Sequence, residues 1–127
     1  TREIENIIFI SYLAIRRKYR YSGYGSILLK ELKEFFKNNE FIILEVDSKL
    51  GAKNKKELEV INRRNNFYLK NGFKKIENIE YSVYGVEYDL LIYKLNCKSI
   101  SNSEILEIME KFYKDIVDMR FFHTKVK

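Results

Sequence analysis

A chain of 127 residues with 46% apolar and 33% charged side chains has the composition of one soluble globular domain and is too short for two. No apolar run is long enough to span a bilayer, and the single cysteine, Cys97, excludes disulfide frameworks and cysteine-rich zinc sites and indicates a reducing cytoplasm. The net charge of +6 suggests an anionic partner, but the lysines are spread along the chain, which argues against nucleic acid.

The first predicted strand runs from Ile7 to Ile15, after a polar lead-in from Thr1 to Asn6. It is apolar at nearly every position, so we expect it to be buried on both faces in the middle of a sheet. A turn, Arg20–Ser26, then leads into an amphipathic helix over residues 27–36.

That turn, with the sequence Arg-Tyr-Ser-Gly-Tyr-Gly-Ser, has the composition of an anion cradle. The first N–H groups of a helix have no partner within the helix, and the helix dipole favours negative charge there. Gly23 and Gly25 lack a Cβ, so a phosphate can approach their backbone closely, and Arg20 adds positive charge. The turn therefore predicts a phosphorylated ligand, although two glycines in this position can also serve only as a tight turn.

The middle of the chain predicts a buried strand over Phe41–Asp47 and a helix over Glu57–Asn71, which Gly72 ends. Because a helix separates the first two buried strands, we expect a parallel pair joined by a right-handed crossover. The segments 73–84 and 86–95 are rich in β-forming residues and predict a hairpin around the glycine between them.

A final helix is predicted after a capping box formed by Ser101 and Glu104. Its apolar stripe consists of Ile105, Ile108, Met109, Phe112, Ile116 and Met119. Such a stripe predicts a core or subunit contact and no chemistry. His123 follows the helix and is interpreted as a tail residue, and nothing in the sequence has metal-ligand spacing.

Two motifs resemble the GNAT superfamily of N-acetyltransferases. The first is the cofactor loop Arg-x-x-Gly-x-Gly between a strand and a helix, formed here by Arg20, Gly23 and Gly25. The second is a helix that runs into Phe-Tyr, then three residues, then Gly-Phe, and it stands at Phe67–Phe73. Both occur in the family's order, separated by a helix and a buried strand, and the resemblance covers Ile7–Leu95.

The resemblance implies an α/β (α+β) fold: a GNAT-like mixed sheet with flanking helices and an extra C-terminal helix. Residues 1–96 would form the partial acetyl-CoA-binding core, and residues 97–127 a C-terminal helical extension of the same domain. By this resemblance the chain would open at the family's fourth strand, and we expect the N-terminal strands to be missing. One side of the strand Ile7–Ile15 would then lack a partner, and we expect either upstream residues or a second copy, as a homodimer, to complete the sheet.

Acetyl transfer from acetyl-coenzyme A to an amine by direct attack is the reaction that the resemblance implies. The backbone of the turn would hold the pyrophosphate, and the backbone at the end of the first strand would pair with the pantetheine arm. The implied cofactor-binding residues are Leu13, Ile15, Arg20, Tyr21, Ser22, Gly23, Tyr24, Gly25 and Ser26. The acceptor, a small molecule or a protein, is left open, because the missing elements commonly form one wall of its site.

The resemblance also implies two catalytic residues. Tyr68 in the second motif is the candidate general acid for the leaving thiolate, and the alternative is a core aromatic on a helix face. Glu45 is the candidate base. It stands in the sequence Leu-Glu-Val, which resembles the Leu-Glu-Val of the ribosomal-protein alanine acetyltransferases. Burial at a strand end would raise its pKa toward a useful value, while the alternative is a side chain that points to solvent or pairs with a lysine.

Two other functions compete with this one. A catalytically degenerate GNAT-like domain would keep the fold and serve as a binding or interaction module. A basic nucleic-acid-binding domain would instead show salt-dependent binding and no affinity for coenzyme A.

Overall fold

The computed structural model of the chain describes residues 2–4, 7–10, 24–96, 98–114 and 117–127. Its strands are β1 (Arg2–Ile4), β2 (Ile7–Ile10), β3 (Phe41–Asp47), β4 (Lys74–Lys75), β5 (Ile79–Val83), β6 (Val86–Lys94) and β7 (Phe122–Val126). Its helices are α1 (Tyr24–Phe35), α2 (Lys55–Lys70) and α3 (Asn102–Tyr113), with short 3-10 helices at Lys49–Gly51 and Met119–Phe121.

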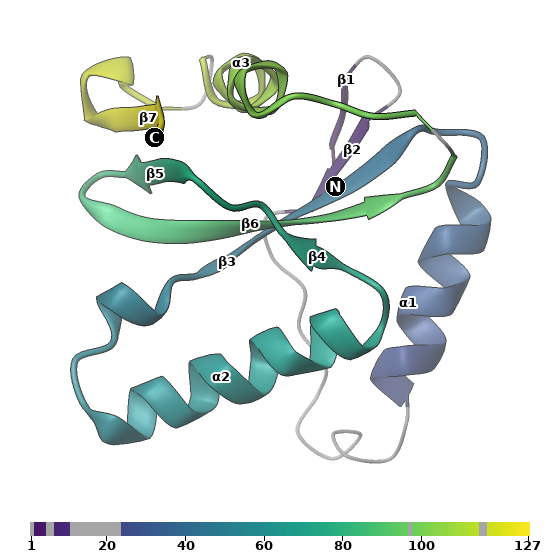
Figure 1. Cartoon of the computed structure of the whole chain (residues 1–127), viewed down its shortest axis with the longest axis horizontal. Helices are drawn as coiled ribbons and strands as arrows, with labels where there is room; N and C mark the ends of the chain where they lie inside the picture. The colour runs from purple at the N-terminus through teal and green to yellow at the C-terminus, as the bar shows by residue number, and fades with distance from the viewer. Residues whose placement is uncertain (1, 5–6, 11–23, 97, 115–116) are drawn as a thin grey trace.

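The strands form a mixed sheet in the order β1-β2-β3-β6-β5-β7, and β4 pairs with β6 beside this path. β2 and β3 are parallel, as predicted for two buried strands joined through a helix. The other described pairs are antiparallel. The predicted mixed α/β class is therefore confirmed, with helices on both sides of the sheet (Figure 1).

Each face of the sheet carries its own apolar cluster. In β3, Ile42 and Leu44 face the cluster that includes Leu29 of α1 and Tyr68 of α2. Ile43, which is fully buried, faces the opposite cluster, where the apolar residues of α3 pack. Because successive strand residues point to opposite faces, a strand that is apolar throughout requires this double cover. Figure 1 shows α3 on one side of the sheet and α1 and α2 on the other.

The N-terminal prediction needs correction. The polar segment from Thr1 to Asn6, expected as a lead-in, contains β1, which pairs antiparallel with β2 from Arg2↔Phe9 to Ile4↔Ile7. The described part of β2 therefore has a neighbour on the side that was expected to be open. The remainder of the predicted strand, residues 11–15, lies outside the described residues. That further residues or a second copy continue the sheet beyond β1 stays a prediction.

The C-terminal prediction is right for the helix and wrong for the segment after it. The capping box is formed. The Ser101 hydroxyl accepts a hydrogen bond from the backbone N–H of Glu104, and the Glu104 carboxylate accepts one from the backbone N–H of Ser101. His123, however, lies in β7, opposite Ser82 of β5. β7 pairs with all five residues of β5 on the edge away from β6, so it supplies partners to the backbone groups of that edge. The extension is thus a helix and a strand of the same sheet.

Gly72 ends α2, as predicted, with a positive φ of +93°. A Cβ at this position would lie 3.0 Å from Cε2 of Tyr93. We expect Gly72→Ala to lower the free energy of unfolding by about 1–2 kcal/mol for the left-handed backbone, and further for the displaced ring. Gly85 is the matched control, because its φ is +77° and its Cβ position has no neighbour within 4 Å. Urea unfolding of both alanine variants tests this, and equal losses would contradict a contact with Tyr93.

Candidate functional site

The start of α1 is the part of the predicted cofactor site that the structure describes. The helix begins at Tyr24, three residues earlier than expected, so Tyr24, Gly25 and Ser26 form its first turn. Gly25 is buried, Ser26 is exposed, and no acidic residue lies in this turn. Three N–H groups of a first turn without negative charge can receive an anion. The other predicted cofactor positions, Leu13, Ile15, Arg20, Tyr21, Ser22 and Gly23, lie outside the described residues.

Glu45 lies near the end of β3, opposite Leu90 of β6. By strand alternation its side chain shares a face with Ile43, on the α3 side of the sheet. Its Oε2 accepts hydrogen bonds from the hydroxyl of Tyr81 at 2.5 Å and from the hydroxyl of Tyr113 at 2.6 Å. Within the described residues Glu45 neither points freely to solvent nor pairs with a lysine. The carboxylate is held by two hydroxyl donors.

Burial and these hydrogen bonds act on the Glu45 pKa in opposite directions. Burial raises the pKa because the charged carboxylate loses hydration, and the nearby charge of Asp47 adds to the rise. The hydrogen bonds from Tyr113 and Tyr81 lower it, because they favour the charged form. Burial prevails, so the pKa lies above its ordinary value of 4.5, as the sequence predicted. Both tyrosine pKa values are raised, by burial first and then by the neighbouring carboxylate, so both hydroxyls remain donors.

A raised carboxyl pKa has a defined effect on stability. Well below pH 4.5 both the folded and the unfolded chain hold the Glu45 proton, so the group contributes no pH dependence there. As pH rises from 4.5 through the higher folded pKa, the unfolded state loses its proton first, and the folded state loses stability. We expect Glu45→Gln, which cannot ionise, to gain stability relative to the wild type across this window. Urea unfolding at pH 4 and pH 7 measures the difference, and a pH-independent difference would contradict the raised pKa.

Tyr68 lies near the end of α2 and is 4% exposed. Its ring shares a cluster with Ile8, Leu44 and Phe73, and the Tyr68 and Phe73 ring centroids are 6.2 Å apart. This cluster covers the sheet face opposite Glu45. The two predicted catalytic residues therefore approach the sheet from opposite sides, and the role of the Tyr68 hydroxyl stays a prediction.

Two asparagines with a buried side-chain oxygen precede Tyr68 on α2. The Oδ1 atoms of Asn62 and Asn65 are buried and accept no hydrogen bond from the described part of the chain. Asn65 is only 9% exposed and lies three residues before Tyr68, one helical turn away. Buried polar atoms without a partner are rare in folded proteins and call for a ligand or water.

The sequence did not identify Tyr81 and Tyr113 as site residues. Tyr81 lies in the segment 73–84, which was predicted only as one strand region of a hairpin. Tyr113 follows Phe112 just beside the predicted stripe of α3, and a helix pattern cannot show which strand residue lies opposite it. Their common partner is a consequence of tertiary structure.

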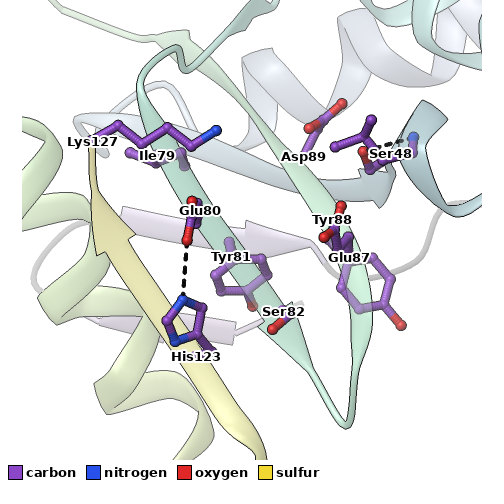
Figure 2. A pocket seen from close by; sticks show the side chains of 11 residues that line it. Ser48, Ile79, Glu80, Tyr81, Ser82, Glu87, Tyr88, Asp89, His123 and Lys127 are labelled. Atoms are coloured by element: carbon purple, nitrogen blue, oxygen red, sulfur yellow. Dashed lines mark hydrogen bonds and ion pairs between the residues drawn. The ribbon is translucent and has the colours of Figure 1, made fainter.

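A pocket is lined by residues of β5, β6 and β7, and Tyr81, the hydrogen-bond donor to Glu45, is one of them (Figure 2). Figure 2 shows His123 pointing to Glu80, and the two side chains are 3.2 Å apart. Glu87 and Asp89 line the same pocket from β6. None of the predicted site residues lines it.

Two further properties concern the described residues alone. None of their helices is both long and apolar enough to cross a bilayer. They also contain no group of three or more His, Cys, Asp or Glu side chains placed to hold a metal ion.

Comparison with known proteins identifies the fold and the family. The chain resembles the crystal structure of a protein from Desulfovibrio desulfuricans assigned to the GNAT family of acetyltransferases, at 18% identity and a TM-score of 0.53. It resembles the ribosomal-protein-S18-alanine N-acetyltransferase of Escherichia coli with the same two values. Each likeness covers 76% of this chain, but only 57% and 59% of those longer chains.

No curated protein matches the sequence closely enough to add a relative. The family model of the acetyltransferase (GNAT) domain matches residues 1–75, which is more than half of the chain. This segment contains both sequence motifs, the start of α1, Glu45 and Tyr68. The chain therefore belongs to the GNAT family of acetyltransferases.

Proposed function

We propose that this chain transfers an acetyl group from acetyl-coenzyme A to a primary amine by direct attack. The observation that carries the proposal is the Glu45 carboxylate, which is partly buried, has a raised pKa and is held by two hydroxyl donors. A carboxylate of this kind is suited to take a proton from an ammonium group near neutral pH. Membership of an acetyltransferase family supports the same reaction.

Two features of the described residues fit coenzyme A. The first turn of α1 offers the N–H groups of Tyr24, Gly25 and Ser26 to a pyrophosphate, without an acidic side chain in that turn. The buried Oδ1 of Asn65 lacks a donor, and the pantetheine arm carries amide N–H groups of the required type. Arg20 and the backbone of Leu13 and Ile15 would complete the site, as the family resemblance implies.

The position of Glu45 in the sheet suggests where the acetyl group would be held. The described pairing of the parallel strands β2 and β3 ends at Ile10↔Leu44, and Glu45 is the next residue along β3. Ligands of open α/β sheets bind outside the carboxyl ends of parallel strands. Glu45 on one face of the sheet and Tyr68 on the other would flank a group held at this end.

Acetyl-coenzyme A would supply an activated thioester carbonyl when bound. Glu45 would remove one proton from the acceptor ammonium, which leaves a neutral amine able to form the new C–N bond. As the C–S bond breaks, Tyr68 would donate its hydroxyl proton to the departing sulfur. Tyr68 would then recover a proton from the newly bonded nitrogen, and Glu45 would release its proton to solvent. One proton is released in each cycle, together with the amide and coenzyme A.

Binding of coenzyme A tests the proposal without knowledge of the acceptor. A ligand that binds only the folded state stabilises it, by about 2.7 kcal/mol at 100 times its dissociation constant. We expect coenzyme A to raise the melting temperature of the wild type, and Gly23→Asp to abolish the rise by adding negative charge in the turn. Gly51→Asp is the control, because Gly51 is exposed and its Cβ position has no neighbour within 4 Å.

An unchanged melting temperature at millimolar coenzyme A, in a folded chain, would contradict the proposal. A rise without detectable acetyl transfer would instead indicate the degenerate binding module.

A further inference from the structure

The two hydrogen bonds to Glu45 share one acceptor atom. Both tyrosine hydroxyls donate to Oε2, and Oε1 accepts no hydrogen bond from the described part of the chain. Two hydrogen bonds to the same oxygen fix the orientation of the carboxylate, because rotation about the Cγ–Cδ bond would break both of them. The unbound oxygen is then the one available to another donor.

We propose that Tyr81 and Tyr113 are positioning residues that hold Glu45 by Oε2 and leave Oε1 to take the proton of the acceptor amine. This inference rests on the proposed function of Glu45 as base. Tyr113 belongs to α3, and both tyrosines lie beyond residues 1–75, the segment that matches the family. The C-terminal helix would therefore complete the active site, in addition to covering the core.

Aromatic packing fixes the positions of both hydroxyls. The Tyr113 ring lies 5.9 Å from Phe9 of β2 and 5.3 Å from Phe122 of β7, measured between ring centroids. The Tyr81 ring lies 5.6 Å from the same Phe122 and 6.5 Å from Tyr113. β2, β5, β7 and α3 thus meet around the two phenols. This packing limits the rotation of both rings and preorganises the donors for one carboxylate oxygen.

The two tyrosine hydroxyls are the main groups that stabilise the ionised form of Glu45. Tyr81 faces it from β5, Tyr88 from β6 and Tyr113 from α3, and Asp47 lies two residues along its own strand. In the described part of the chain, no lysine, arginine or histidine forms an ion pair with Glu45. Loss of either hydroxyl should therefore make the ionised carboxylate less favourable.

The proton step uses only Oε1. The acceptor nitrogen loses a proton, Oε1 gains it, and the electron pair of the N–H bond remains on the nitrogen. Both tyrosines keep their own protons, because their pKa values are raised. Their hydrogen bonds weaken when Glu45 is neutral and strengthen when it ionises again.

Carbon-13 NMR of glutamate side-chain carboxyls tests the arrangement directly. The Glu45 resonance is assigned as the signal that Glu45→Gln removes, and it is followed with pH in the wild type, Tyr81→Phe and Tyr113→Phe. We expect each variant to shift the Glu45 titration to higher pH. Tyr88→Phe is the matched control, since Tyr88 lies near Glu45 without a hydrogen bond to it, and should leave the titration nearly unchanged. If Tyr81→Phe does not fold, Tyr113→Phe alone carries the test, because both hydroxyls bind Oε2.

The pH dependence of kcat/KM separates this inference from the proposed function. An ionised base gives activity that rises with pH through its pKa, so the acidic limb should move to higher pH in both phenylalanine variants. Titrations that match the Tyr88→Phe control would overturn the positioning role, even if Glu45 proves essential for activity. Shifted titrations in a chain without acetyl transfer would support the positioning of the carboxylate and contradict the proposed reaction.

Discussion

Replacement of Tyr68 by phenylalanine is expected to lower turnover by about 10²–10⁴-fold while the affinity for coenzyme A stays nearly unchanged. The substitution removes one hydroxyl and keeps the ring that packs beside Phe67 and Phe73. If the hydroxyl supplies a proton to the departing sulfur, its loss slows the chemical step and leaves the bound state intact. Steady-state kinetics with an identified amine, together with calorimetric titration of coenzyme A, measures the two quantities separately.

Tyr93→Phe is the control for this experiment. Tyr93 belongs to the same cluster and packs on Phe73 with ring centroids 5.5 Å apart, so its variant tests the loss of a tyrosine hydroxyl near this core. We expect Tyr93→Phe to retain turnover. Equal turnover in Tyr68→Phe and the wild type would show that Tyr68 only packs in the core.

The second large effect is expected from Glu45→Gln, which should lower kcat/KM by about 10²–10⁴-fold near neutral pH. Glutamine keeps the shape of the side chain and an oxygen that can accept from Tyr81 and Tyr113, but it cannot take a proton. The acidic limb of the pH profile should disappear as well. Asp47→Asn is the control: Asp47 lies on the same strand and is exposed, so this variant should keep its activity near neutral pH, and loss of the Asp47 charge should only move the acidic limb to lower pH. An unchanged profile in Glu45→Gln would show that another group is the base.

Strong periodic patterns allowed much of the fold to be predicted from the sequence. The strand Phe41–Asp47 has the predicted boundaries, and α2 and the capped start of α3 lie where propensity and capping residues placed them. In each of these elements a long apolar pattern is bounded by residues that favour the beginning or the end of an element, such as a capping serine or a glycine. Gly72 and the turn at Tyr84 and Gly85 also have the positive φ values that such stops favour.

The two short strands at the ends of the chain escaped prediction for a physical reason. β1 has three residues and β7 has five, too few for a period-two pattern to exceed chance. Both strands lie at the ends of the sheet order, beside β2 and β5. Such a short strand forms because the neighbouring strand has backbone N–H and C=O groups that need partners. A local sequence pattern contains no information about that neighbour.

The site could be predicted only in part for a similar reason. The sequence predicted a cofactor turn close to the start of α1 and gave Tyr68 and Glu45 as candidates, whose roles stay predictions, and the burial of Glu45 followed from its position in an apolar strand. Which donors would hold that carboxylate depended on how β5 and α3 pack together, since Tyr81 and Tyr113 are 36 and 68 residues away from Glu45 in the chain. Contacts at such separations leave no spacing rule in the sequence.

Titration of the nitrogen-15-labelled chain with coenzyme A, monitored by amide NMR, tests the central claim most directly. The proposal places the pyrophosphate at the first turn of α1, so the largest changes should occur at the amides of Tyr24, Gly25 and Ser26. The amide of Gly51, in the exposed 3-10 helix, serves as the internal reference and should not change. Saturating coenzyme A that leaves the first turn of α1 unchanged, or that alters only residues elsewhere, would contradict the proposed function.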